Sequence, residues 1–130
     1  MASIFTKIIR REIPAHIVAE DDFYLAFLDI MPLVKGHTLV IPKVEIDYVF
    51  DLDDETLSGL HLFSRTVASA IQKATNCKRV AVAVLGLEVP HAHIHLIPMN
   101  RMDDANFANP KLKLSADELA SVAQKIRDSF

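Results

Sequence analysis

The stretch His91-Ala92-His93-Ile94-His95-Leu96-Ile97 places a histidine at every second position, with an apolar residue between each pair. Side chains two residues apart in a β-strand point to the same face of the sheet. The alternation therefore predicts a strand over residues 91–97. Its three imidazoles form a row on one face, and its apolar side chains belong to the core on the other face.

The segments on both sides of this stretch complete a predicted fold. Residues 79–85 form a second strand, and a short connection with Gly86 and Pro90 makes the two strands antiparallel neighbours at the centre of the sheet. Three more strands are predicted upstream. They cover residues 16–19, 23–29 and 37–41.

Three segments have helical patterns. Residues 53–76 carry apolar side chains at spacings of three and four, with Asp53 as the N-cap. A short helix follows Ser3 and stops before Pro14, and a terminal helix begins at the capping box Ser115–Glu118. Strands grouped around one long helix, without regular strand-helix alternation, predict an α+β fold with an antiparallel sheet and short terminal helices. We expect residues 1–130 to form a single domain.

Composition excludes several classes of function. Apolar residues make up 51% of the 130 residues and charged residues 24%, which is typical of a chain that folds. A net charge of −3 does not provide the excess of positive charge that binding to nucleic acid requires. No segment resembles a signal peptide or a membrane span. The simplest interpretation is a cytoplasmic protein without a membrane partner. Cys77 is the only cysteine, so we interpret it as a structural thiol.

Three interpretations of the histidine row compete. It can be an exposed polar face of a strand, although neighbouring imidazoles repel one another once protonated. It can also hold a metal, although successive alternate positions stand about 7 Å apart and converge poorly on one ion. In the third interpretation, a neutral imidazole attacks phosphorus while its neighbours hold the phosphate oxygens. The absence of a G-x-S-x-G elbow, a P-loop and a G-x-G-x-x-G loop favours this third interpretation.

The run at residues 91–97 resembles the signature of the histidine triad (HIT) superfamily, in which histidines alternate with hydrophobic residues. Residues 4–9 (IFTKII), 25–30 (LAFLDI) and 36–43 (GHTLVIPK) are similar to the Hint branch in order and spacing. The resemblance covers residues 3 to about 98. It leaves a C-terminal helical extension, about 99–130, without an assigned role.

The resemblance implies a HIT-like fold, a homodimer and binding of a small purine nucleotide. It also implies hydrolysis of nucleoside 5′-phosphoramidates or related adenylylated compounds through a phosphohistidine, with no cofactor and no catalytic metal. By position, His93 is the nucleophile, His95 contacts the phosphate and His91 supports the orientation of the nucleophile. Glutamine replaces the third histidine in transferase branches, so His95 favours hydrolysis. His37 corresponds to a family histidine for which we favour a structural role.

The same resemblance implies the nucleotide-binding residues. Asp29 corresponds to the carboxylate that binds the ribose, and Glu88 and the backbone amides near Val89 lie on the phosphate side. Apolar residues that can form the wall of the base pocket, or simply pack in the core, are Phe5, Ile8, Phe23, Leu25 and Ile30.

Several positions depart from the family pattern. Many relatives hold zinc with two cysteines and a histidine where this chain has Ser3, Thr6 and Glu45, so we expect no structural zinc. A carboxylate at position 45 would repel a bound phosphate unless it is turned away or protonated. The loop before the run is short, and Leu87 stands where glutamine is frequent. These departures leave a nucleotide-binding regulatory module with weak or no hydrolysis, and a metal-binding protein, as rival functions.

Overall fold

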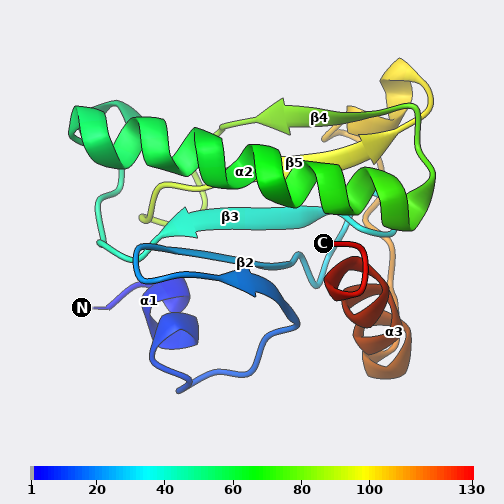
Figure 1. Cartoon of the computed structure of the whole chain (residues 1–130), viewed down its shortest axis with the longest axis horizontal. Helices are drawn as coiled ribbons and strands as arrows, with labels where there is room; N and C mark the ends of the chain where they lie inside the picture. The colour runs from blue at the N-terminus through cyan, green and yellow to red at the C-terminus, as the bar shows by residue number, and fades with distance from the viewer. Residues whose placement is uncertain (1) are drawn as a thin grey trace.

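A computed structural model describes residues 2–130 (Figure 1). Its core is a five-stranded antiparallel sheet in the order β1-β2-β3-β5-β4, which confirms the predicted α+β class. The strands are β1 (Ile17–Glu20), β2 (Tyr24–Leu28), β3 (Thr38–Pro42), β4 (Arg79–Ala83) and β5 (Ile94–Met99). The helices are α1 (Ile4–Ile9), α2 (Asp54–Thr75) and α3 (Ala116–Arg127), with 3-10 turns η1 (Val49–Asp51) and η2 (Met102–Ala105).

Helix α2 lies along one face of the sheet (Figure 1). Asp53 caps its first turn by accepting the N–H of Thr56 at 2.7 Å, and the helix ends where Asn76 turns to a left-handed conformation, φ 54°. Its buried stripe includes Leu60 and Ile71, each fully buried. Burial of such a side chain contributes about 1.5–3 kcal/mol, which attaches the helix firmly to the sheet. Among residues 2–130, the structure contains no helix long and apolar enough to cross a membrane.

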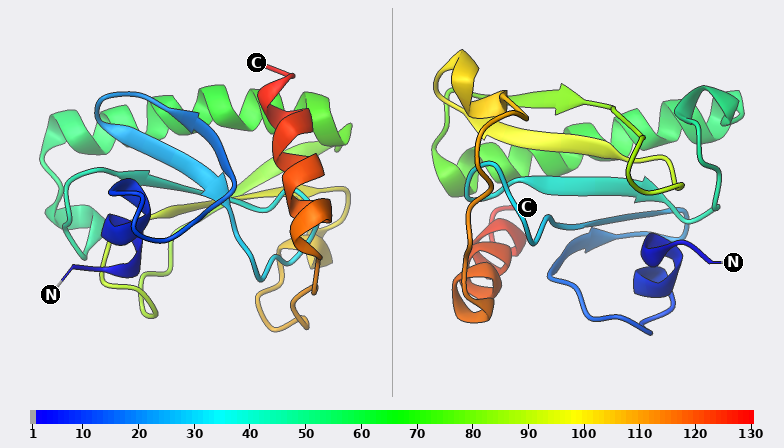
Figure 2. Two further views of the ribbon diagram at one scale, coloured as in Figure 1. Left: turned by 90° about the horizontal axis from the view of Figure 1, so that it is seen from below. Right: turned by 180° about the vertical axis from the view of Figure 1, so that it is seen from behind.

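The two faces of the sheet have separate cores. Alternate residues of β2, such as Ala26 and Leu28, pack under α2 and α3. Leu25 and Phe27 point to the opposite face and pack with Phe5 of α1. Because α1 has only six residues, it covers just one end of this second face, which we call the α1 face (Figure 2).

Two predictions about the central strands are wrong. Strand β5 begins at Ile94, so the row of three histidines is not on one strand. The chain before β5 is held elsewhere, because the N–H of His91 bonds to Val89 O and that of Ala92 bonds to Ile46 O. Strand β4 ends at Ala83 and is an edge strand; β3 is the central strand. Strand order depends on long-range pairing, which local patterning does not specify.

Candidate active site

Pairing in the sheet places His95 on the α1 face. Leu39 of β3 lies opposite His95, and residues directly opposite each other share a face. Leu39 belongs to the core of the α1 face. Phe5 of α1 packs against the rings of His91 and His93, and Phe107, in the segment that leads to α3, packs against the ring of His95.

The ring of His93 has a defined tautomer. Its Nδ1 lies 2.7 Å from the main-chain oxygen of His91. A carbonyl oxygen only accepts hydrogen bonds, so Nδ1 carries the proton and Nε2 of the neutral ring retains its lone pair. Phe5 holds the ring edge-on at a centroid distance of 5.0 Å. The backbone of His91, rather than its side chain, therefore orients His93.

His37 and His95 form a buried hydrogen-bonded pair. The N–H of Leu33 donates to His37 Nδ1 at 3.0 Å, so the ring proton of neutral His37 is on Nε2. This Nε2 lies 2.9 Å from Nδ1 of His95 and donates to it. The remaining nitrogen of His95, Nε2, then carries a proton that it can donate to a ligand. Its ring lies beside that of His93, with the centroids 5.1 Å apart.

Burial keeps this pair neutral. Desolvation is the main cause that lowers the pKa of His37 to about 3 and the pKa of His95 to about 4. Gly36 places His37 here through a positive φ of 95°, and a Cβ at that position would lie 3.1 Å from Thr75 and 3.2 Å from Pro98. We expected a structural role for His37. Its hydrogen bond to His95 makes it a positioning residue of the site.

His91 is completely buried and is held at both ring nitrogens. Its Nε2 donates to Pro42 O at 2.7 Å, so its Nδ1 accepts from Ser3 Oγ at 2.9 Å. Thr6 Oγ1 donates to Glu45 Oε1 at 2.6 Å, and the N–H of Ser3 donates to the same carboxylate oxygen. Desolvation is the main cause of the lowered pKa of His91. We call Ser3, Thr6, Glu45 and His91 the α1 clip.

The carboxylate of Glu45 is engaged in the α1 clip. It accepts hydrogen bonds from Ser3 and Thr6 at the first turn of α1. The main-chain N–H of Ser3 and the hydroxyl of Thr6 lower the pKa of Glu45 to about 2. Because the clip contains oxygen donors that bond to one another and no thiolate, its residues do not fit a structural zinc site.

Asp29 lies next to the histidine pair, with Oδ2 3.7 Å from His37 Nε2. Its Oδ1 accepts the N–H of Met31 at 2.9 Å, and desolvation raises the pKa of its carboxyl. Ligand atoms of Asp29, His37 and His95 lie within 4.8 Å of one another, so this trio could hold a metal ion. A metal would have to displace the proton between the two rings.

The predicted wall of the base pocket is divided. Phe5, Ile8 and Leu25 are buried together on the α1 face, and Val89 packs against them. Phe23 is 70% exposed in the β1–β2 turn, where its ring packs edge-on against Tyr24, a residue of the core under α2. Ile30 follows Asp29 and is 63% exposed, and Glu88 is also exposed.

Sequence reasoning missed Phe27. Its ring packs edge-on against Phe5 at 5.4 Å, and it lies two residues before Asp29. The alternation of Leu25, Phe27 and Asp29 could have identified it, because these positions share one strand face. Phe27 did not stand out in the sequence because all of β2 is apolar, and every residue of this strand is buried.

A cavity of about 420 Å³ opens beside His93. This volume is within the range of small-molecule sites. Leu87, which is 97% exposed, stands at its rim. The predicted wall residues lie outside this cavity, whose lining consists of Asp47, Tyr48, Val49, Phe50, Leu57, His61, Val84, Leu85, Gly86, Leu87, Ala92 and His93.

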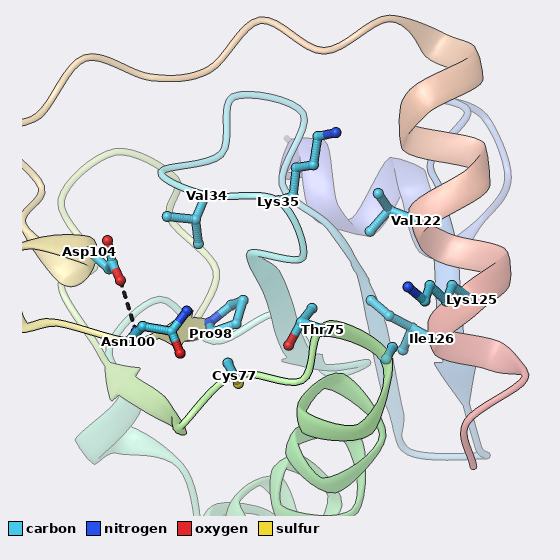
Figure 3. Close-up of a pocket in the computed structure, with 11 residues that line it drawn as sticks. Val34, Lys35, Thr75, Cys77, Pro98, Asn100, Asp104, Val122, Lys125 and Ile126 are labelled. Atoms are coloured by element: carbon cyan, nitrogen blue, oxygen red, sulfur yellow. Dashed lines mark hydrogen bonds between the residues drawn. The ribbon is translucent and has the colours of Figure 1, made fainter.

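A second cavity, of about 400 Å³, lies between the C-terminal end of α2 and α3 (Figure 3). Cys77, Pro98 and Ile126 line it, and the histidine run does not. Cys77 is buried, in agreement with a structural thiol. Of these two cavities, the one beside His93 adjoins the candidate active site.

Comparison with known proteins shows the family of this chain. A model of the HIT domain family matches residues 10–102, which include all of the strands. The chain belongs to the histidine triad family. The Hint-like branch is consistent with the same comparison.

Relatives of this histidine triad chain extend over nearly its whole length. An uncharacterized HIT-like protein of Borreliella burgdorferi is 35% identical, over 95% of this chain and 94% of its own length. An adenosine 5′-monophosphoramidase of Schizosaccharomyces pombe is 33% identical, over 97% and 96%. A Hit-like protein of Bartonella henselae involved in cell-cycle regulation has the same fold, with a TM-score of 0.85 and 37% identity over 98% of this chain and 96% of that chain.

Proposed function

We propose that this histidine triad protein hydrolyses purine nucleoside 5′-phosphoramidates, or related adenylylated compounds, and releases a nucleoside monophosphate. One observation carries the proposal. The hydrogen bond from His93 Nδ1 to His91 O leaves His93 Nε2 unprotonated, next to a His95 ring whose Nε2 bears a proton. A nucleophile and a hydrogen-bond donor thus lie side by side on the α1 face.

In the first step, His93 Nε2 attacks the α-phosphorus and forms a P–N bond. The bond from phosphorus to the leaving amine breaks, its electron pair goes to the amine, and the amine takes up a proton from solvent. His95 Nε2–H donates to a non-bridging phosphate oxygen, whose negative charge it stabilises. The carboxylate of Asp29 accepts from the ribose hydroxyls.

In the second step, water attacks the phosphohistidine. The P–N bond to His93 breaks and its electron pair returns to Nε2, while the water loses a proton to solvent. The nucleoside monophosphate then leaves. Two steps of lower barrier replace one direct displacement, and none of them uses a metal. The relative that is an adenosine 5′-monophosphoramidase supports this chemistry.

The decisive experiment measures AMP release from adenosine 5′-phosphoramidate in the presence of a chelator. We expect turnover by the unmodified protein and its loss, by at least about 1,000-fold, in His93→Ala, because His91 and His95 present no free lone pair to the phosphorus. His16→Ala, at a partly exposed histidine of the β1 side, is the matched control and should retain activity.

The same experiment separates the rival functions. If the unmodified protein binds AMP but releases none from the phosphoramidate, it is a nucleotide-binding regulatory module. If turnover requires an added metal and purified protein contains that metal, the trio of Asp29, His37 and His95 is a metal site instead. Its ligand atoms are close enough for this outcome to be tested.

We also propose that the protein is a homodimer that pairs along β4. This edge strand has one unpaired side, and unpaired edges favour addition of another strand. Apolar side chains are exposed near it, including Val82 (59%), Leu85 (57%) and Leu62 of α2 (55%). A second copy would cover these side chains and the edge together.

A further inference from the structure

The C-terminal extension enters the candidate active site. The ring of Phe107 packs edge-on against His95, with the centroids 5.0 Å apart, and against His37 at 6.2 Å. Residues 106–112 link η2 to the start of the α3 segment and pass the end of β3 and β5 (Figure 2, right). The histidine pair is therefore covered by a part of the chain that lies outside the matched HIT domain.

Lys111 is held against Phe107 in two ways. Its Nζ donates to the main-chain oxygen of Phe107 at 3.1 Å and lies 5.2 Å from the centre of that ring. An ammonium group has three donors, so two remain after the bond to the carbonyl. Contact with the aromatic face also stabilises the cation at this place.

The segment that carries Lys111 is attached at both ends. Asn109 Nδ2 donates to Asp103 O at 2.9 Å, next to η2. On the other side, the N–H of Leu112 donates to Pro32 O at 2.8 Å, in the loop between Asp29 and His37. A cation on a segment attached in this way is positioned before a ligand arrives, which reduces the entropic cost of binding.

The charge of Lys111 reaches the site residues. It contributes to the lowered pKa of both His37 and His95, and it opposes the desolvation that raises the pKa of the Asp29 carboxyl. Phe107 contacts both the ammonium and the ring of His95, so the ammonium lies one aromatic ring away from the histidine pair. A phosphate next to His95 would lie in the field of a cation that the histidine run itself does not supply.

We propose that Lys111 binds a non-bridging oxygen of the substrate phosphate at the His93–His95 pair, and that Phe107 positions this lysine and the ring of His95. The inference rests on the proposed nucleotide chemistry at His93. It gives the C-terminal extension a function, which is recognition of the phosphate. The site then holds the oxyanion between a neutral donor, His95, and a charged donor, Lys111.

The test compares the affinities of AMP and adenosine by calorimetry. Lys111→Gln keeps a donor for the Phe107 carbonyl but removes the charge. Because hydrogen bonds to charged groups contribute about 1.5–3 kcal/mol, AMP should bind about 10- to 150-fold more weakly, while the affinity for adenosine stays unchanged. Lys111→Arg should recover most of the AMP affinity. Lys113→Gln, an equal change of charge at an exposed lysine two residues away, should match the unmodified protein.

A second measurement uses the unmodified sequence. In protein labelled at lysine Cε, the Lys111 resonance should shift on addition of AMP and not on addition of adenosine. This NMR experiment remains decisive even if a Lys111 variant does not fold.

The outcomes separate the two proposals. Equal AMP affinity in Lys111→Gln and the unmodified protein, or an equal loss for adenosine, overturns the role of Lys111 while leaving hydrolysis at His93 intact. AMP binding that depends on Lys111, without any turnover, overturns hydrolysis and retains the phosphate contact. An unmodified protein that binds no AMP overturns both.

Discussion

Hydrogen bonds to the histidine rings distinguish residues that are equivalent in the sequence. His91 is held by Pro42 O and Ser3 Oγ, His93 by a backbone oxygen, and His95 by another histidine. Each partner selects a tautomer, and the tautomer decides whether a ring presents a lone pair or a proton. On this basis only His93 presents a free lone pair among the three members of the run.

At the residue scale, we expect His37 to act through His95. His37→Phe removes the donor that keeps the His95 proton on Nε2, so kcat for the phosphoramidate should fall by up to about 100-fold with little change in KM. His37→Gln, which can still donate, should retain more activity. Steady-state kinetics of both variants over pH test this prediction. Wild-type kcat in His37→Phe would refute it.

The buried histidine pair also predicts a dependence of stability on pH. The folded-state pKa values, about 3 for His37 and about 4 for His95, lie below the unfolded value of 6.5. The unfolded chain therefore takes up more protons as the pH falls below 6.5. Stability is complete above that pH and is lost as the pH falls toward 4, by up to about 1.4 kcal/mol per pH unit for each histidine.

Urea unfolding at several pH values measures this loss. The His37→Gln variant, with one histidine fewer, should show a shallower slope. A free energy of unfolding that is flat between pH 6.5 and 4.5 would contradict the prediction.

At the scale of elements, a few polar contacts help to attach the short helix α1. A helix of six residues is marginal by itself, and the α1 clip ties its first turn to Glu45 and His91. Phe5 on the same helix packs against the nucleophile ring. Ser3 and Thr6 of the clip therefore support the position of His93 although they lie more than 80 residues away along the chain.

We expect Glu45→Gln to loosen α1. The amide keeps the size of the side chain but accepts more weakly from Ser3 and Thr6, so amide hydrogen exchange in residues 4–9 should become faster at neutral pH. Glu12→Gln, at an exposed glutamate just after the helix, is the matched control. Unchanged exchange in Glu45→Gln would show that apolar packing alone holds the helix.

The clip also predicts the result of restoring metal donors. The triple variant Ser3→Cys, Thr6→Cys, Glu45→His should bind one zinc per chain, because Nδ1 of His91 already points to Ser3. Unmodified protein purified with zinc present should retain far less. Elemental analysis measures the zinc content of both proteins. Stoichiometric zinc in the unmodified protein would contradict our interpretation that Ser3, Thr6 and Glu45 do not form a zinc site.

At the scale of the whole molecule, the unpaired edge of β4 leads to a prediction about assembly. Val82→Lys combined with Leu85→Lys places two charges on the exposed apolar edge, so the proposed dimer should dissociate to a monomer. Light scattering after gel filtration measures the mass. Ile4→Lys, at an exposed residue of α1, should remain dimeric. A monomeric unmodified protein would exclude the dimer.

The sequence by itself determined the α+β class, the extent of α2 with its Asp53 cap, and the family to which the chain belongs. These features depend on local periodicity, capping and motif spacing, and each of these is determined by residues that are close together in the sequence. It also located the histidine run, although it extended the strand through His91 and His93 and placed β4 at the centre of the sheet. The errors arose where main-chain groups bond to distant segments, such as Ala92 to Ile46.

Only the tertiary structure decided what each histidine can do. The tautomer of His95 depends on His37, which is 58 residues away, and the orientation of Glu45 depends on Ser3, 42 residues away. The contact of Phe107 with His95 brings in a segment for which the sequence suggested no role. Such contacts form only when the sheet is paired and its faces are covered. Packing, and not distance along the chain, determines which side chains come close enough to form a hydrogen bond.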